Sequence, residues 1–300
     1  MSDPLEPVLA QLAERLAQEA AQRYRIGADQ ARSRIERAWR SHQALRALAR
    51  KTPSPRALAR TRLYRQAASQ AKKDIYYRLR RYRQESDEFS KGLERLRRAG
   101  AGAQCQAARE ALARSHASTA ERWPDLDDFL ERTRPVWRDC ATLLDIGCGL
   151  MPLLFPFGRV GDRFRRYVAC DRDARCIEAV NACGQVPPGI LEGCVWDIGD
   201  GWEALEKQTG IKRYDAAFLL KLVPVVARQQ PRLLAMLADA PADWLVVTGS
   251  RQALARRQDI SRRERAVLGS FAKRHGLVVE SEFETPSELG LVMRRLRVEP

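Results

Sequence analysis

The chain has 300 residues, 45% of them hydrophobic, and its 53 Lys and Arg outnumber its 38 Asp and Glu to give a net charge of +15. This length predicts two domains, and the apolar fraction is sufficient for a folded core. No run of about 18 uncharged apolar residues occurs, so a membrane span is not expected. The N-terminus lacks the basic start and apolar segment of a secretion signal, so we expect a cytoplasmic protein.

Seven cysteines are present, and no two of them form a C-x-x-C pair. An odd number without such pairs argues against a disulfide framework and against a zinc site. We therefore expect reduced thiols that pack as small apolar groups, and no bound metal.

The positive charge is concentrated in one part of the chain. Residues 51–100 contain 15 Lys and Arg against 5 Asp and Glu. Such a block favours a polyanionic partner, with arginine suited to phosphate contacts. A solvated helix face, or a general arginine bias of the genome, would explain the same pattern. The candidate RNA-binding residues in this block are Arg56, Arg60, Arg62, Arg65, Lys72, Lys73 and Arg78.

The first half of the chain is predicted to be helical. Between residues 5 and 50, leucine and valine recur at steps of three and four. The stretch KTPSPRA (51–57) contains two prolines and interrupts the helical pattern. Basic helix is predicted again for 58–84 and further helix for 104–138, separated by AGAGA (99–103). We expect residues 1–138 to form one helical domain.

Four tyrosines lie among the arginines of the basic segment, namely Tyr64, Tyr76, Tyr77 and Tyr82. Such rings can stack on RNA bases next to phosphate contacts. They can equally pack between helices, and the sequence favours neither alternative.

From Ala141 onward, short apolar runs alternate with helical stretches. The predicted strands are 141–146, 166–170, 190–196, 215–223, 244–248, 277–283 and 290–296. Five alternations followed by two closing strands indicate an α/β fold, a doubly wound sheet with a terminal antiparallel hairpin. We expect residues 139–300 to form a Rossmann-like domain.

A glycine turn follows the first of these strands. The run Asp145-Ile146-Gly147-Cys148-Gly149 ends a strand and precedes a helical stretch, where glycines permit a sharp turn and close approach of a ligand. The third glycine of a dinucleotide fingerprint is missing, and Met151 and Pro152 follow instead. A G-x-G pair alone is a weak signal.

Acidic residues at three successive strand ends strengthen the evidence for a nucleotide-binding turn. Asp145 ends the first strand, and such an acid would repel a pyrophosphate but tolerate an amino-acid ammonium group. Asp171 ends the second strand, where a carboxylate accepts ribose hydroxyls, and Asp197 ends the third, within reach of an adenine amino group. Together they favour an S-adenosylmethionine pocket over a dinucleotide pocket, although any one of them could merely cap a helix.

The sequence around the fourth strand limits which atom of the substrate can be the methylation target. It reads YDAAFLLKLVP, without the N/D-P-P-Y/F motif typical of exocyclic amine methylation, and residues 195–300 contain no cysteine for attack on a pyrimidine ring. Guanine N7 is already nucleophilic, so its methylation requires positioning and no general base.

Five stretches resemble the aminoglycoside-resistance 16S rRNA (guanine-1405-N7) methyltransferases. They are HASTAER (116–122), LLDIGCGLMPL (143–153), FLLKLVPVVARQQP (218–231), WLVVTGS (244–250) and ETPSELGLVM (284–293). The resemblance implies a helical rRNA-docking domain ahead of a Rossmann-like class I S-adenosylmethionine-dependent methyltransferase domain. It also implies N7 methylation of a guanine in the decoding site of the 30S subunit and aminoglycoside resistance. We expect a monomer.

The resemblance assigns roles to matching residues. It implies that Arg122 pairs with the cofactor carboxylate, that Gly147 and Gly149 line its methionine part, and that Asp171 and Asp197 hold its ribose and adenine. It implies that Ile198 and Leu220 flank the adenine and the target base, and that Lys221 and Gln229 lie at the mouth of the cofactor pocket. Lys221 would contact RNA, organise the loop, or simply face solvent at the strand end. No residue is assigned as a certain catalytic group.

Two departures from the family pattern affect the site. Met151 stands where the family usually has Asn, and GSRQAL (249–254) replaces a Phe-Pro start after the fifth strand, which makes Ser250 and Arg251 candidates for positioning the base. The basic segment that follows includes Arg256 and Arg257, which either supply RNA contacts or belong to a surface helix. Two alternatives therefore remain: methylation of another RNA position or substrate, and a non-catalytic RNA-binding or ribosome assembly factor.

Overall fold

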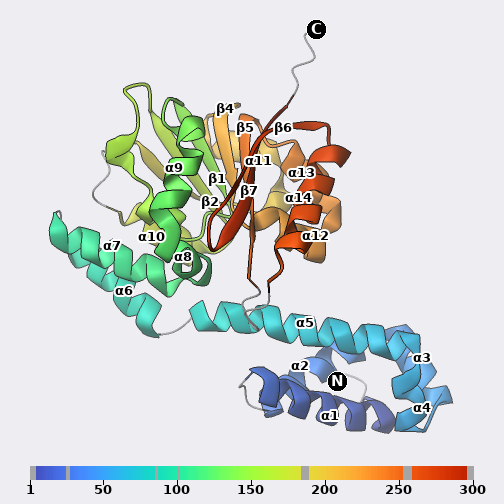
Figure 1. Cartoon of the computed structure of the whole chain (residues 1–300). Coiled ribbons are helices and arrows are strands. Elements are labelled where there is room, and N and C mark those ends of the chain that lie inside the picture. Colours follow the sequence, from blue (N-terminus) through green and yellow to red (C-terminus); the bar gives the residue numbers. More distant parts are fainter. Residues whose placement is uncertain are drawn as a thin grey trace. The chain divides into compact units, whose positions relative to one another are not determined.

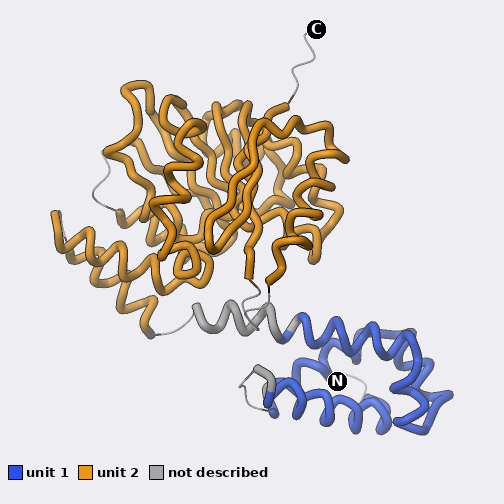
Figure 2. The backbone as a smooth tube through the Cα atoms, in the orientation of Figure 1, with its two compact units in different colours: residues 1–86 blue, residues 87–300 orange. Residues whose placement is uncertain are grey.

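The computed structural model describes residues 5–24, 28–84, 87–99, 102–183, 189–252 and 259–295. Within them, the side chains of residues 23, 24, 30, 74, 76–84 and 87 are not described. The chain forms two compact units, residues 1–86 (unit 1) and 87–300 (unit 2), which Figure 2 distinguishes by colour.

Unit 1 is helical, as the sequence predicts. Its helices are α1 (Pro7–Tyr24), α2 (Ala28–Arg40), α3 (Gln43–Lys51), α4 (Pro55–Arg60) and α5 (Arg62–Gln84). The apolar residues at helical spacing form its buried core, which includes Leu9, Leu12, Leu16, Ile35, Trp39, Leu45 and Leu58. The proline-rich interruption lies between α3 and α4, where Pro55 begins a helix and the Ser54 hydroxyl accepts a hydrogen bond from the amide of Ala57 at 3.4 Å.

One of the four tyrosines can be assigned to packing. The ring of Tyr64 is buried and lies edge-on against Trp39, with ring centroids 5.6 Å apart. The side chains of Tyr76, Tyr77 and Tyr82 lie outside the described residues.

Unit 2 is an α/β sandwich around a seven-stranded sheet (Figure 1). Its strands are β1 (Thr142–Ile146), β2 (Arg166–Asp171), β3 (Leu191–Val195), β4 (Tyr214–Leu219), β5 (Ala242–Ser250), β6 (Leu277–Glu284) and β7 (Glu288–Arg295), in the order β3-β2-β1-β4-β5-β7-β6. The first five pair in parallel, and β7 pairs antiparallel with both β5 and β6. The predicted doubly wound sheet with a closing hairpin is confirmed.

Helices cover both faces of this sheet, so its central strands are apolar on both sides. Leu144 and Ile146 of β1 pack towards the helices α11 (Trp202–Thr209), α12 (Leu222–Gln229), α13 (Leu234–Ala238) and α14 (Ser261–Arg274). The alternate residue Leu143 packs on the other face, with α9 (Leu126–Trp137) and α10 (Ala174–Asn181). The remaining helices of this unit are α6 (Asp87–Arg98), α7 (Ala103–Ser115) and α8 (Ala117–Arg122).

The division between the units falls earlier than the sequence suggests. The expected domain boundary at 138/139 lies inside unit 2, because the helices before it bury their apolar faces on the sheet domain. Trp137 of α9 packs with Leu143 of β1, and Leu112 of α7 packs with Leu150 and Leu153 after the glycine turn. Helical residues 87–138 therefore belong structurally with the Rossmann-like fold.

No described helix combines the length and the apolar character that crossing a membrane requires. All seven cysteines are buried and form no disulfide, so the expectation that they pack as small apolar groups is confirmed.

Candidate active site

The glycine turn lies where the sheet topology favours a ligand. β1 is flanked by β2 on one side and by β4 on the other, so the chain reverses its winding direction at the end of β1. In open parallel sheets, ligands bind beyond the carboxyl ends of the strands at such a switch point. The turn 147–149 leaves β1 at this edge.

The turn needs glycine at both predicted positions. Gly147 and Gly149 have φ angles of 67° and 52°, in the left-handed region that other residues avoid. The amide of Gly147 donates to the carbonyl of Cys170 on β2 at 2.8 Å, which holds the turn against the neighbouring strand. A Cβ on Gly149 would lie 2.8 Å from Cε1 of His116, so backbone and side chain are already in close contact.

Asp171 at the end of β2 is joined to this turn. Its two carboxylate oxygens accept hydrogen bonds from the amides of Gly149 and Asp173, each at 2.9 Å. Burial raises the pKa of Asp171, and these two donors oppose the rise. A carboxylate offers about four acceptor sites, so the two backbone bonds leave capacity for hydroxyl donors of a ligand.

Asp197 follows β3 and is exposed. One of its oxygens accepts from the amide of Gly199 at 2.9 Å, and the Asp200 side chain accepts from the amide of Asp197, which completes a capping box on the short 3-10 helix Ile198–Asp200. The helix-capping alternative therefore applies to this acid. Ile198 is half-buried against the core beside it.

Asp145 is the most deeply buried acid of the site. Its side chain is fully buried, and one oxygen accepts from the phenol of Tyr167 at 2.7 Å. The other oxygen has no hydrogen-bond partner within the described residues. Burial raises the pKa of Asp145 to about 7, against the opposing effects of the Tyr167 hydrogen bond and the Arg122 charge. The sequence predicted the acid but not its tyrosine partner.

Arg122 is buried in an ion pair that the sequence did not predict. Its Nε and Nη2 donate to the two carboxylate oxygens of Glu288 on β7, at 2.7 and 3.0 Å. Its Nη1 points at the sulfur of Met151, 3.2 Å away. A thioether is only a weak acceptor, so Nη1 is the donor that a ligand carboxylate would engage. Whether Arg122 holds a cofactor carboxylate stays a prediction.

Lys221 belongs to the same buried network and does not face solvent. It adopts φ 59° at the start of α12, and its Nζ lies 2.8 Å from Glu121 and 3.3 Å from Glu288. Burial alone would raise the pKa of Glu288, but the charges of Arg122 and Lys221 outweigh it and hold that pKa at about 2. The lysine therefore links α8, α12 and β7.

The other predicted positioning residues lie on separate elements. Leu220 is half-buried directly after β4, and Gln229 is exposed at the end of α12, about 12 Å along the helix from Lys221. Ser250 is the last residue of β5. Arg251 follows it and is held structurally, since its amide donates to the carbonyl of Ser287 and its Nη1 to that of Thr285, both at 2.9 Å.

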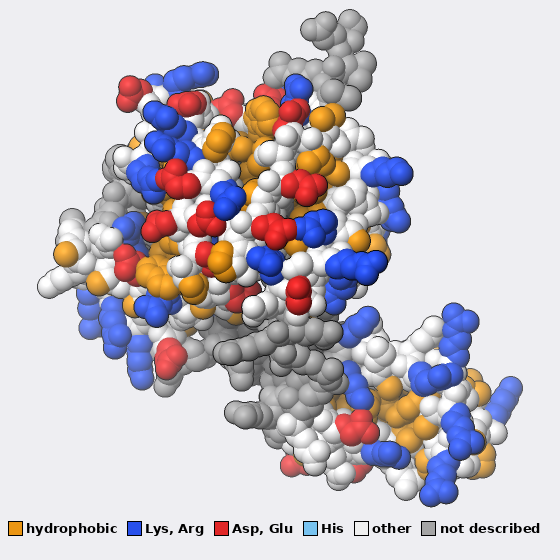
Figure 3. Space-filling view, viewed as in Figure 1, with side chains coloured by type: hydrophobic (Ala, Val, Ile, Leu, Met, Phe, Trp, Pro, Cys, Tyr) orange, Lys and Arg blue, Asp and Glu red, His pale blue; other side chains and the backbone are white. Residues whose placement is uncertain are grey.

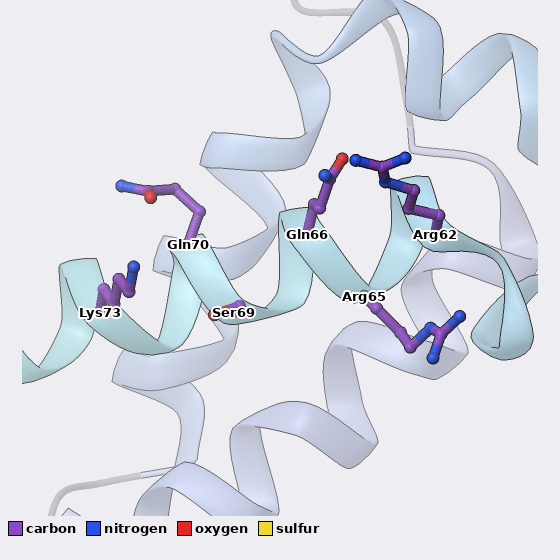
Figure 4. A pocket seen from close by; sticks show the side chains of 6 residues that line it. All are labelled: Arg62, Arg65, Gln66, Ser69, Gln70 and Lys73. Atoms are coloured by element: carbon purple, nitrogen blue, oxygen red, sulfur yellow. The ribbon is translucent and has the colours of Figure 1, made fainter.

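The candidate RNA-binding cations of unit 1 are mostly exposed. Those with exposed side chains are Arg56, Arg60, Arg62, Arg65 and Lys73, whereas Lys72 is paired with Glu19 at 2.8 Å. An open pocket runs along one face of α5 (Figure 4); its lining residues are Arg62, Arg65, Gln66, Ser69, Gln70 and Lys73. On the face shown in Figure 3, Lys and Arg side chains gather over unit 1, whereas unit 2 mixes both signs of charge.

Three cations of the prediction cannot be placed. Arg256 and Arg257 lie outside the described residues, as does the side chain of Arg78. Among the residues that the structure describes, no group of three or more His, Cys, Asp or Glu side chains is arranged to hold a metal ion.

The chain is similar to known rRNA methyltransferases. Residues 41–285 match the family model for "Ribosomal RNA methyltransferase (FmrO)". Curated 16S rRNA (guanine(1405)-N(7))-methyltransferases are 32% identical over 125 residues in Micromonospora olivasterospora and 43% identical over 70 residues in Micromonospora rosea. These matches cover 42% and 22% of this chain, and 40% and 24% of the relatives' own lengths.

Solved structures show the same fold. The 16S rRNA methyltransferase RmtF in complex with S-adenosyl-L-homocysteine has a TM-score of 0.59 at 22% identity, covering 97% of this chain and 100% of that one. The 16S rRNA methylase ArmA has a TM-score of 0.53 at 21% identity, covering 69% and 98%. Because the family match covers residues 41–285, from α3 through β6 to the turn that follows it, the chain belongs to the FmrO family of ribosomal RNA methyltransferases.

Proposed function

We propose that the protein is an S-adenosylmethionine-dependent methyltransferase that methylates N7 of a guanine, of the 1405 type, in the decoding site of 16S rRNA. It acts in the cytoplasm on the 30S subunit, as a monomer, and its product protects the ribosome from aminoglycosides. The observation that carries the proposal is the family match over residues 41–285, which includes both the cationic helices of unit 1 and the glycine turn of unit 2.

The residues at the turn fit the cofactor. Gly147 and Gly149 carry no Cβ and adopt positive φ angles that let the backbone turn at the end of β1, a buried carboxylate oxygen of Asp145 has no partner within the described residues, and Asp171 retains acceptor capacity. Within the part of the chain that the structure describes, the acceptor of Arg122 Nη1 is the thioether of Met151. These groups match, in order, an amino-acid main chain, its ammonium group, a ribose diol and a carboxylate.

Methyl transfer to guanine N7 requires orientation of the base and does not require proton transfer by the protein. The bound cofactor supplies an electrophilic methyl group on a sulfonium. Guanine N7 already carries a free lone pair, so the chain has to bring the base in line with that methyl group and exclude water. The candidate positioning residues lie at the carboxyl ends of β4 and β5, at the edge where the base would approach: Leu220 and Lys221 follow β4, Ser250 ends β5 and Arg251 follows it. None of them needs to act as a general base.

The exposed cations of unit 1 suit the docking step. Arg62, Arg65 and Lys73 lie on one face of α5 and make no ion pair within the described residues. Contacts of this kind bind phosphates and position an enzyme without reading sequence. We infer that unit 1 recognises the shape of folded rRNA.

The test is methyl transfer to purified 30S subunits from radiolabelled S-adenosylmethionine, followed by mapping of the modified nucleotide by mass spectrometry. We expect one N7-methylated guanine in the decoding site, and kanamycin and gentamicin tolerance in cells that express the protein. Methylation of free tRNA without methylation of 30S subunits would contradict the proposal. Asp171→Asn serves as the inactive control.

A second candidate is methylation of a different rRNA position. It is favoured by the loop after β5, where Arg251 is tied to the β6–β7 turn through Thr285 and Ser287 and where the family's Phe-Pro start is replaced. The same mapping distinguishes it, because the label would appear at another nucleotide. A non-catalytic assembly factor predicts no binding of S-adenosylhomocysteine at all, which calorimetry tests directly.

A further inference from the structure

Asp145 and Tyr167 form a buried pair beside the candidate cofactor site. The two residues lie diagonally on the adjacent strands β1 and β2, where Tyr167 pairs with Leu143 and Asp145 with Ala169, and each has a relative exposure of 0%. The phenol occupies one carboxylate oxygen of Asp145 at 2.7 Å, while the other oxygen has no partner within the described residues. A buried acceptor without a donor is costly, and this one lies two residues before Gly147.

The surroundings of Asp145 do not satisfy this oxygen. The titratable and charged groups that face the carboxyl are Tyr167, Cys170 and Asp171 on β2, Cys148 in the turn, and Arg122 on α8. Among the described residues Arg122 is the one cation of this group, and its N–H donors are directed at Glu288 and Met151, so that none of them bonds this oxygen. A cationic N–H donor from outside the protein is therefore the partner that suits the free oxygen.

We propose that Tyr167 is a positioning residue for the amino-acid end of the cofactor. Its phenol fixes one oxygen of Asp145 so that the other receives the ligand's ammonium group, and binding is coupled to loss of a proton from Asp145. The inference rests on the proposed cofactor of this site and adds a regulated step to it. The carboxyl O–H bond breaks, its electron pair stays on the carboxylate, and the proton passes to bulk solvent.

The coupling has a definite direction. In the free protein the pKa of Asp145 is about 7, so a large share of the molecules carries a neutral acid at pH 6 and below. The ammonium group binds the ionised form, hence affinity falls as the pH falls through this pKa. The phenol hydrogen bond favours the ionised form, so without it the pH midpoint moves upward.

A comparison of two ligands distinguishes the pH dependence caused by Asp145 from the titration of other groups in the site. S-Adenosylhomocysteine carries the amino-acid end, whereas 5′-methylthioadenosine keeps the adenine, ribose and thioether but has no ammonium group. Calorimetry between pH 5.5 and pH 8.5 should show S-adenosylhomocysteine binding on the order of 30-fold more weakly at the acid end. The affinity of 5′-methylthioadenosine should be nearly constant. Any effect of Asp171 on the ribose would change both ligands alike.

Variants identify the residue responsible. Tyr167→Phe removes only the hydroxyl and should move the pH midpoint for S-adenosylhomocysteine upward, and Asp145→Asn should abolish the pH dependence. Tyr214→Phe is the matched control, since Tyr214 is also buried in the sheet but its hydroxyl lies 3.1 Å from that of Thr209, away from the site. It should keep the wild-type midpoint.

The outcomes distinguish failure of the proposed role of the Asp145–Tyr167 pair from failure of the cofactor assignment. Equal pH dependence of the two ligands, or an unchanged midpoint in Tyr167→Phe, would overturn the role of the pair while leaving the cofactor assignment intact. Failure of the wild-type protein to bind S-adenosylhomocysteine at any pH would instead contradict the proposed function. If Tyr167→Phe does not fold, as judged by its thermal transition, the comparison of the two ligands on the wild-type protein decides.

Discussion

Replacing Glu288 by glutamine would remove the centre of the buried charge network in unit 2. The carboxylate of Glu288 has 0% exposure, binds Arg122 through two hydrogen bonds and lies 3.3 Å from Nζ of Lys221. Glutamine keeps the shape but not the charge. Two cations would then be left buried, with Glu121 as the nearest acid to Lys221.

The size of the effect follows from the titration of this group. Its pKa is lowered from 4.5 to about 2 in the folded protein, and at about 1.36 kcal/mol per pKa unit this corresponds to about 3 kcal/mol of stability. No discount for solvent screening is needed, because the side chain is fully buried. Breaking a buried ion pair costs about 3–5 kcal/mol in general, which agrees.

The pH dependence has a fixed sign. Because the folded-state pKa is depressed, this stabilisation is fully present above pH 4.5 and is lost as the pH falls towards 2. Urea unfolding at pH 7, followed by circular dichroism, should give a free energy of unfolding about 3 kcal/mol lower for Glu288→Gln than for the wild-type protein. The difference should shrink at pH 3.

A matched control uses Glu284, on the neighbouring strand β6. Its side chain is 43% exposed and pairs with Arg265 at the surface, so Glu284→Gln should change stability by less than about 1 kcal/mol. Equal stabilities of the two variants at pH 7 would refute the reasoning. So would a loss of wild-type stability between pH 4.5 and pH 2 no steeper than that of Glu288→Gln.

Three further predictions concern cofactor binding, the stability of the glycine turn and RNA docking. Asp171→Asn should weaken S-adenosylhomocysteine binding by about 2 kcal/mol, measured by calorimetry, because a charged acceptor for the ribose is lost; unchanged affinity would refute the assignment. Gly149→Ala should lower the free energy of unfolding by at least about 1 kcal/mol in urea, since φ 52° and the contact with His116 oppose a Cβ. The control Gly158→Ala has open space and should be nearly neutral. Replacing Arg62, Arg65 and Lys73 by glutamate should weaken binding to 30S subunits and reduce the dependence of that binding on salt concentration, while the affinity for S-adenosylhomocysteine stays constant. An unaltered salt dependence would argue against a docking role for these three cations.

Local patterns in the sequence predicted the elements well. Short apolar runs bounded by polar segments identified every strand of the sheet. The central strands β1 and β4 are buried on both faces and read as continuous hydrophobic stretches, whereas β6 is largely exposed and carries only a short apolar run at its start. Leucine and valine at helical spacing identified the core of unit 1 in the same way. Residues 87–138 are helical as predicted, but they group with the sheet and not with unit 1, because helical periodicity shows that a segment has an apolar face but not which surface that face meets.

The sequence by itself determined the glycine turn and the acids at the strand ends, because these depend on neighbours along the chain. Gly147 and Gly149 have positive φ, Asp171 ends β2, and Asp197 follows two residues after the end of β3. Tertiary structure alone decided the partners of the buried charges. Arg122 meets Glu288 across 166 residues, and Tyr167 meets Asp145 across two strands. Such pairs arise only when the sheet order places distant strands side by side, and no local pattern records that order.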